Sequence, residues 1–279
     1  MHPILIDLGE VNLPLFGEVH FFIPTYGFIV MIAAFLTLMI WIKLSKREGF
    51  DVSRMIDLGF YLLLAGIVGS KAALLLVDFR YYLENPGEII YIYKVAGVYL
   101  GGVIAALATI IIFALKNRLP LWRLSDTICI PLPLGQAIGR IGCFFAGCCF
   151  GRPAEGLSWA ITFTNPIAHE NTGVPLGIPL HPTQIYQSLN DFTLFLMLLV
   201  LWRFKKFDGE ITWSYIFLYS LSRGIIELFR GDISRGLYFN GLLSTSQIIG
   251  SIGAISAAVI LFILYRKSKK EAGSHGEKP

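Results

Sequence analysis

The chain has 279 residues, of which 55% are hydrophobic and only 15% are charged, and its mean hydropathy is +0.65. An ordinary soluble domain has about 25% charged residues. This composition excludes a disordered chain and a nucleic-acid-binding domain built on a basic surface, so no nucleic-acid partner is expected. The formal net charge is only +4, and the position of the charges is more informative than their sum. Long apolar runs predict an all-α integral membrane protein.

Seven stretches are long and apolar enough for transmembrane helices, each of which needs roughly 20 residues. The fourth is the least apolar, and its prolines Pro131 and Pro133 predict a kinked helix that neighbouring helices support. We treat residues 1–266 as one membrane domain, with an extracytoplasmic loop at about 142–185 that forms a small cap and a basic cytoplasmic tail at 267–279. The seven stretches are 24–42, 57–77, 95–115, 124–141, 186–202, 211–228 and 245–265.

The basic residues predict the orientation of the helices. Most Lys and Arg residues lie in loops, and in a C-terminal tail, that share one side of the membrane if there are seven spans. No Lys or Arg precedes the first span. The positive-inside rule therefore places the N-terminus outside and the C-terminus in the cytoplasm. The missing basic n-region and the basic loop after the first span also predict that this span is not a cleavable signal peptide.

Charged side chains within two of the spans indicate a site for an anion. Such groups are costly in a bilayer and usually face the interior of a helix bundle or water. Tyr219, Arg223, Glu227 and Arg230 follow one another at helical spacing, so they are expected on one stripe of the sixth span. Arg140 lies in a glycine-rich run at the outer end of the fourth span. The alternative interpretations are a self-satisfied ion pair and an interfacial arginine on a helix-packing face.

Several polar or glycine-rich segments reach the same membrane depth when the spans are counted from an outside N-terminus. This coincidence is hard to attribute to helix packing alone, and it predicts a site at the level of the outer leaflet. The cytoplasmic loops, in contrast, are rich in Lys and Arg and suit anchoring to anionic lipid. The segments at the outer depth carry Tyr26, Gly101 with Gly102, Arg140, His181, and the stripe that ends at Arg230.

Three of the four cysteines form a cluster in the loop after the fourth span. Cys143, Cys148 and Cys149 have the spacing C-x4-C-C, and a disulfide is possible among them in an oxidising compartment. A zinc site would need a fourth ligand and more regular spacing. The sequence therefore predicts no metal and no cofactor, and a structural or incidental role for the cluster.

The run GRIGCFFAGCCFGRP at 139–153 strongly resembles the signature of the prolipoprotein diacylglyceryl transferase family. Other motifs match in the family's order, so the resemblance covers nearly the whole chain. They are Tyr26-Gly27, Gly101-Gly102, HPTQIYQ at 181–187, YSLSRGIIELFRGD at 219–232 and LSTSQ at 243–247.

The resemblance implies an enzyme of the bacterial cytoplasmic (inner) membrane that acts on membrane lipid. A diacylglyceryl group would move from phosphatidylglycerol to the lipobox cysteine of a prolipoprotein signal peptide, forming a thioether and releasing glycerol phosphate. Arginine suits the departing phosphate because its planar fork of donors is permanently charged. The catalytic candidates are Arg140, Arg223, Glu227, Tyr26 and Tyr219. The candidates for phosphatidylglycerol binding are Arg140, Arg230, Gly101, Gly102, Gly142, Gly151 and His181.

The sequence departs from the best-known version of the family at four positions. Leu100 stands where many members have a histidine or an aromatic residue, which excludes a histidine base at that position. Cys143 replaces an asparagine, Cys148 stands at an acidic position, and Gln187 replaces a glutamate. The candidates for activating the substrate thiol are therefore Tyr26, Tyr219, His181 and the positive field of Arg140.

Two other functions compete with the transferase. A membrane thiol–disulfide oxidoreductase would use the three clustered cysteines, but it usually needs a C-x-x-C pair or a quinone site. An anion or lipid transporter would use the arginines within the spans, but it favours an internal repeat or paired broken helices. The sequence contains none of these additional features.

Overall fold

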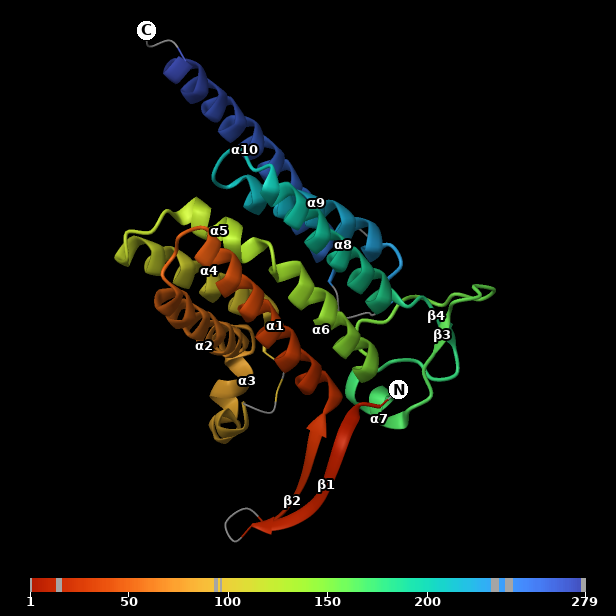
Figure 1. Cartoon of the computed structure of the whole chain (residues 1–279). Coiled ribbons are helices and arrows are strands. Elements are labelled where there is room, and N and C mark those ends of the chain that lie inside the picture. Colours follow the sequence, from red (N-terminus) through yellow and green to blue (C-terminus); the bar gives the residue numbers. More distant parts are fainter. Residues whose placement is uncertain are drawn as a thin grey trace. The chain divides into compact units, whose positions relative to one another are not determined.

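A computed structural model describes residues 2–13, 17–92, 95, 97–231, 236–238 and 243–276 (Figure 1). Within these ranges, only the backbone is described at 11–13, 17–20, 237–238, 243 and 271–276. The chain is mostly helical. Its elements are β1 (Ile4–Leu13), β2 (Gly17–Pro24), α1 (Thr25–Arg47), α2 (Val52–Val77), α3 (Phe79–Glu84), η1 (Pro86–Tyr91), α4 (Tyr99–Lys116), α5 (Leu121–Cys129), α6 (Leu132–Ala146), β3 (Ile161–Thr162), α7 (Pro166–Thr172), β4 (Pro179–Leu180), α8 (Thr183–Arg203), α9 (Glu210–Glu227), β5 (Leu237–Tyr238), β6 (Leu243–Ser244) and α10 (Thr245–Gly276).

Six segments of the described chain are long and apolar enough to cross a membrane: α1, α2, α4, α5 with α6, α8, and residues 245–270 of α10. They coincide with six of the seven stretches expected from the sequence, and the prediction of an all-α membrane protein is confirmed. The remaining stretch forms α9, which is a full helix but is not one of the six. Its Arg223 and Glu227 lower its hydropathy. The count of seven spans and their orientation stay predictions.

The fourth span contains the kink that its prolines predict. The helix α5 ends at Cys129 and α6 begins at Leu132, with Pro131 at the junction. A proline ring cannot donate a backbone hydrogen bond and clashes with the preceding turn, so the helix is interrupted there. The helix that carries Arg140, α6, is therefore separate from α5.

The N-terminal residues form a β-hairpin that the sequence analysis did not predict. Strands β1 and β2 pair antiparallel, with irregular register between Ile4 and Ile6 and between Asp7 and Gly9. Gly9 has a φ of +78°, and its backbone N–H donates to Asp7 Oδ1 over 2.9 Å. A glycine adopts this left-handed conformation without steric cost, which allows the bulge.

The segment between α6 and α8 folds into a small cap. Its two short strands β3 and β4 pair antiparallel, and α7 lies between them in the chain. It begins after Ala146, because α6 extends beyond the predicted limit at 142. A small hydrophobic core holds it together. That core consists of Phe163, Ala168, Val174 and Leu180, with Phe150 and Ile161 packed against it.

The chain divides into two compact units, residues 1–39 with 128–279 and residues 40–127. In the first unit α6 packs against α8, α8 against α9 and α9 against α10, as Figure 1 shows. In the second unit α2 packs against α4. The helix α10 continues to Gly276, so much of the basic tail expected at 267–279 extends the last helix.

Candidate active site

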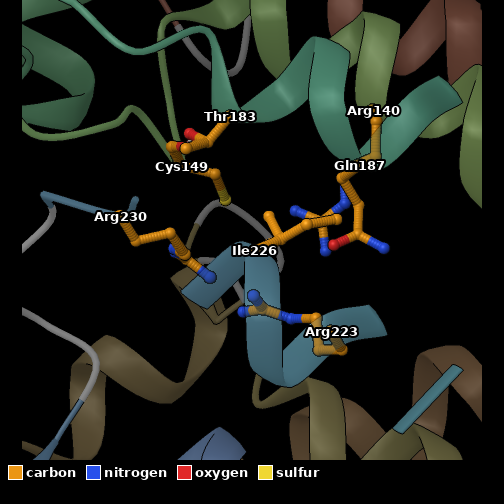
Figure 2. Close-up of a pocket in the computed structure, with 7 residues that line it drawn as sticks. All are labelled: Arg140, Cys149, Thr183, Gln187, Arg223, Ile226 and Arg230. Atoms are coloured by element: carbon orange, nitrogen blue, oxygen red, sulfur yellow. The ribbon is translucent and has the colours of Figure 1, made fainter. Parts of the chain in front are cut away.

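Three arginines from two helix ends line one pocket in the first unit. Arg140 comes from the last turns of α6, Arg223 from α9, and Arg230 from just beyond α9. Figure 2 shows their guanidinium groups and the sulfur of Cys149 directed toward a common space. Thr183, Gln187 and Ile226 complete the lining. The predicted convergence of Arg140 with the α9 stripe is present in the structure, and it concentrates positive charge.

Glu227 is the carboxylate that holds two of these arginines. Its Oε2 atom lies 2.7 Å from Arg223 Nη1 and 3.9 Å from Arg230 Nη1. The Glu227 side chain is only 2% exposed, and both arginine side chains are less than one-seventh exposed, at 12% and 13%. The helical spacing predicted these pairings, because residues three and four apart share a helix face. With Arg140 added, positive charge exceeds negative charge, as a site for an anion requires.

The backbone of Arg230 is fixed by the cap. Gly151 and Arg230 form a β-bridge, the Arg152 N–H donates to the Phe229 carbonyl over 2.9 Å, and the Gly231 N–H donates to Phe150 over 3.2 Å. A Cβ atom at Gly151 would lie 2.3 Å from the carbonyl oxygen of His181, which is far inside contact distance. Only glycine permits this approach. Gly151 therefore positions the backbone of Arg230. A direct contact of Gly151 with the lipid stays a prediction.

Gln187 and Asp191 are a polar pair that the analysis of the sequence did not identify as part of the site. Asp191 is 1% exposed and its Oδ1 accepts hydrogen bonds from Gln187 Nε2 over 2.7 Å and from Asn190 Nδ2 over 3.1 Å. The Asp191 carboxylate interacts electrostatically with Arg140. The sequence does contain a signal for Asp191, because it is an acidic residue within the apolar run of the fifth span. Asp191 thus places a carboxylate directly against Gln187, which lines the pocket.

His181 lies beside the pocket, within a group of aromatic rings, and does not line it. Its Nδ1 is 3.3 Å from the Tyr186 hydroxyl, which also accepts a hydrogen bond from Trp159 over 2.9 Å. The Phe229 ring is 5.3 Å from the imidazole. Burial lowers the pKa of His181 below its usual value, and the nearby positive charge of Arg152 lowers it further. The structure therefore favours the neutral imidazole.

Tyr26 lies in a different cavity, of about 270 Å³, which is mostly apolar and is lined by residues of the hairpin, the end of α6 and α7. Tyr26 is 46% exposed. Gly142 lets the ring approach α6, because an added Cβ would lie 3.1 Å from Tyr26 Cδ2. The structure therefore brings Tyr26 and Gly142 together, but it does not bring Tyr26 into the lining of the arginine pocket.

The Tyr219 ring lies against that of Tyr215, with centroids 5.5 Å apart and planes tilted by 34°, and Tyr219 interacts electrostatically with Arg140 and Arg223. It is not one of the residues that line the pocket. Tyr215 in turn donates a hydrogen bond to Gln136 Oε1 over 2.9 Å. Tyr219 is thus near enough to affect the arginines electrostatically without lining their pocket.

Gly101 and Gly102 belong to the second unit, where they allow α2 and α4 to pack closely. A Cβ at Gly101 would lie 2.2 Å from Ala73 Cβ and 2.5 Å from the Gly69 carbonyl oxygen, and one at Gly102 would lie 2.9 Å from the Gly66 carbonyl oxygen. Small residues at such positions are typical of membrane helix interfaces. Their predicted role in lipid binding stays a prediction.

The fold is that of a helical membrane protein in which three arginines line one pocket and two of them pair with one buried carboxylate, so positive charge is in excess there. The family model described as prolipoprotein diacylglyceryl transferase matches residues 14–264, and the chain belongs to this family.

Three relatives, each named phosphatidylglycerol–prolipoprotein diacylglyceryl transferase, illustrate the similarity. The protein of Finegoldia magna is 36% identical over 87% of this chain and 91% of its own length. The protein of Clostridium tetani is 31% identical over 97% of this chain and 100% of its own. The protein of Bacillus velezensis is 33% identical over 95% of this chain and 93% of its own length.

Proposed function

We propose that this chain transfers the diacylglyceryl group of phosphatidylglycerol to the cysteine thiol of a prolipoprotein, the first step of lipoprotein maturation. Membership of the transferase family supports the reaction. The structural observation that carries the proposal is the pocket of Arg140, Arg223 and Arg230, which matches the anionic phosphate of the lipid. The acceptor would be the lipobox cysteine of the signal peptide. The comparisons favour this function over the oxidoreductase and the transporter.

The chemistry requires a phosphate to depart from carbon. The substrate sulfur forms a bond to the terminal glyceryl carbon, the carbon–oxygen bond to phosphate breaks, and glycerol phosphate leaves with the electron pair of that bond. Negative charge does not disappear during this step but becomes concentrated on the departing phosphate. Guanidinium groups bind phosphate with two parallel hydrogen bonds each. Positive charge that is already in place, in a site shielded from water, stabilises such a transition state strongly.

We assign Arg223 and Arg230 to the phosphate, with Glu227 holding both in position. Gln187 and Thr183 also line the pocket. The second amide N–H of Gln187 would donate to an oxygen of the lipid head group, and Thr183 Oγ1, whose proton binds the Cys149 carbonyl, would accept from a head-group hydroxyl. His181 would act from the aromatic group beside the pocket, through its contact with Gly151, and not as a direct ligand of phosphate.

Activation of the substrate thiol is assigned to Arg140. Among the four candidates, Arg140 alone is a lining residue of the pocket, whereas Tyr26 lines another cavity and Tyr219 lies to the side. A thiol has an ordinary pKa of about 8.5, so a nearby positive charge is sufficient to raise the thiolate fraction substantially. The thiol proton would pass to solvent or to the departing phosphate.

The enzyme would act within the bacterial cytoplasmic (inner) membrane as a multi-pass protein, with its site at the depth of the outer leaflet. Six apolar segments support a multi-pass membrane protein. Both substrates carry hydrophobic chains, so they would enter from the bilayer between helices. Gly101 and Gly102 are retained in this proposal as contacts for the lipid.

The test is transfer by the purified protein in detergent, with phosphatidylglycerol and a lipobox peptide, followed by mass measurement of the thioether product. Arg140→Ala and Arg223→Ala should each reduce turnover by about 10²–10³, the usual cost of removing one charge-stabilising donor. Arg223→Lys should restore little, because a point charge does not reproduce the bidentate fork.

Arg54→Ala is the matched control, since Arg54 is 51% exposed and pairs only loosely with Asp51, at 3.9 Å. It should retain normal transfer. Unfolding temperatures in detergent would verify that all variants are folded. Near-normal turnover of folded Arg140→Ala or Arg223→Ala would remove that arginine from the mechanism.

A further inference from the structure

Three cysteines lie close together in the structure, although their spacing in the sequence did not predict a metal site. The sulfur atoms of Cys143, Cys148 and Cys149 all lie within 4.8 Å of one another. All four cysteines are free of disulfide bonds in the structure. Cys143 is buried and the other two are half-buried. The group is therefore a compact set of thiols within the protein, and not a set of exposed, separate side chains.

The backbone at the end of α6 produces this convergence. Gly147 caps the helix with a φ of +81°, and the Cys148 N–H donates to the Cys143 carbonyl over 3.1 Å. Cys149 has a φ of +57°, a conformation that residues with a side chain rarely adopt. These two left-handed residues turn the chain back on itself, so Cys148 and Cys149 return to Cys143.

Neighbouring segments hold the turn in place. Thr183 Oγ1 donates to the Cys149 carbonyl and Gln184 Nε2 to the Cys148 carbonyl, both over 2.8 Å. Gly147 packs against Ala168 and Val174 in the core of the cap. The thiols are therefore mounted on a supported backbone, which reduces the conformational cost of binding a ligand.

The spacing of the sulfurs suits one thiophilic cation. A zinc–sulfur bond is about 2.3 Å long, so sulfurs in a tetrahedral site are about 3.8 Å apart. Sulfurs that already lie within 4.8 Å of one another reach that separation by small side-chain rotations. Thiolates select zinc, cadmium and copper(I) over magnesium or calcium. Three protein ligands with one open position form a recognised type of zinc site.

We propose that Cys143, Cys148 and Cys149 bind one thiophilic metal ion of the zinc(II) class as three thiolates, and that the bound ion weakens phosphate binding in the arginine pocket. On binding, each thiol releases its proton to solvent and forms one sulfur–metal bond. No electron is transferred. The effect on catalysis rests on the proposed function, whereas the binding of the metal does not.

The surrounding charges support both halves of the proposal. Three thiolates and a divalent ion carry a net charge of −1, which Arg140 and Arg230 would stabilise. Because Cys149 also lines the pocket (Figure 2), the anionic cluster would offset part of the positive charge that attracts the lipid phosphate.

Cadmium(II) is the probe for binding, because cadmium–thiolate bonds absorb in the ultraviolet. Titration of the reduced, full-length protein in detergent should give a saturable absorption band at one ion per chain. Cys143→Ser, Cys148→Ser and Cys149→Ser should each weaken binding by at least about tenfold, since each removes a ligand. Cys129→Ser is the matched control and should bind normally. A band that is absent from the wild type, or that is unchanged in Cys148→Ser, overturns the site.

A second measurement on the wild type needs no variant. Alkylation followed by mass mapping should show that cadmium(II) protects Cys143, Cys148 and Cys149, but not Cys129. Equal labelling of the three clustered cysteines with and without the ion overturns the site, even if a cysteine variant fails to fold.

Transferase activity tests the second half of the proposal. Zinc(II) should lower transfer by about tenfold or more in the wild type and in Cys129→Ser, because it offsets charge that stabilises the departing phosphate. A chelator should reverse the effect, and Cys148→Ser should lose most of the sensitivity. Inhibition that persists in Cys148→Ser overturns the coupling to catalysis. If no transfer occurs at all, the proposed function fails, while the cadmium titration still decides whether the metal site exists.

Discussion

Arg140 and Arg223 face the same pocket, but their surroundings differ. Arg223 is held by a 2.7 Å ion pair with Glu227, whereas Arg140 has no ion pair among the described residues and interacts at longer range with buried Asp191. A guanidinium that is closely paired is rigid but partly neutralised. A guanidinium whose counter-charge is more distant, such as that of Arg140, exerts a stronger positive potential on a ligand. This difference is the reason to assign the phosphate to Arg223 and the thiol to Arg140.

His181 gives a prediction for the dependence of stability on pH. Its pKa in the folded protein is lowered by burial and by Arg152, while the unfolded chain has the ordinary value near 6.5. Above that value the imidazole is neutral in both states and contributes nothing. As the pH falls below it, the unfolded chain binds a proton that the folded protein resists, so the folded state loses stability.

The measurement is the unfolding temperature in detergent, recorded from about pH 7.5 to about pH 5, on either side of the ordinary histidine pKa. His181→Gln should lose less stability on acidification than the wild type. Arg152→Gln should lie between the two, because it removes one cause of the lowered pKa. Parallel curves for the wild type and His181→Gln would contradict the prediction.

At the scale of elements, two close contacts depend on glycine in different ways. In the second unit, Gly69 and Gly101 let α2 and α4 touch through backbone atoms. In the first unit, Gly151 lets the cap lie against both His181 and the end of α9. The first arrangement stabilises a pair of helices, and the second positions the backbone of an arginine of the pocket.

Gly101→Val should separate α2 from α4, because a side chain there would overlap Ala73 and the Gly69 carbonyl. We expect a destabilisation of about 1–3 kcal/mol, typical of overpacking, seen as a lower unfolding temperature in detergent. Gly66→Ala on α2 is the control, since the structure places nothing within 4 Å of its Cβ position.

The same variant distinguishes packing from lipid binding. If Gly101 only packs helices, the Michaelis constant for phosphatidylglycerol should not change in the fraction of protein that stays folded. A selective increase in that constant, without loss of stability, would instead indicate a direct contact with the lipid.

At the scale of the whole molecule, the orientation in the membrane rests on the distribution of basic residues. The cap that follows α6 carries exposed Ser158, and α10 carries Ser268 near the end of its apolar segment, next to Lys267 and Lys269. If there are seven spans, these positions lie on opposite sides of the membrane, with the cap outside. The outer-leaflet position of the arginine pocket depends on the same orientation.

Single cysteines at Ser158 and Ser268, in a chain that lacks its four native cysteines, test this orientation. A membrane-impermeant thiol reagent applied to intact cells should label Ser158→Cys and spare Ser268→Cys. Permeabilised cells should label both, which controls for reactivity. The reverse pattern in intact cells would place the pocket on the cytoplasmic side.

The sequence by itself determined the class of protein, six of its apolar segments, the kink at Pro131 and the ion pairs of Glu227. Each of these properties is local. Hydropathy depends on consecutive residues, a proline interrupts its own helix, and helical spacing places residues three and four apart on one face. The motifs indicated the family for the same reason, since they are short runs in a known order.

Only the tertiary structure decided which of the candidate residues meet. It brought Arg140 to Arg223 and Arg230, placed Tyr26 in another cavity, and revealed Asp191 behind Gln187. These results depend on how separate helices pack, which no local pattern encodes. The convergence of the three thiols depends on left-handed backbone at Gly147 and Cys149. A non-glycine residue such as Cys149 adopts that conformation only because the surrounding hydrogen bonds and packing stabilise it.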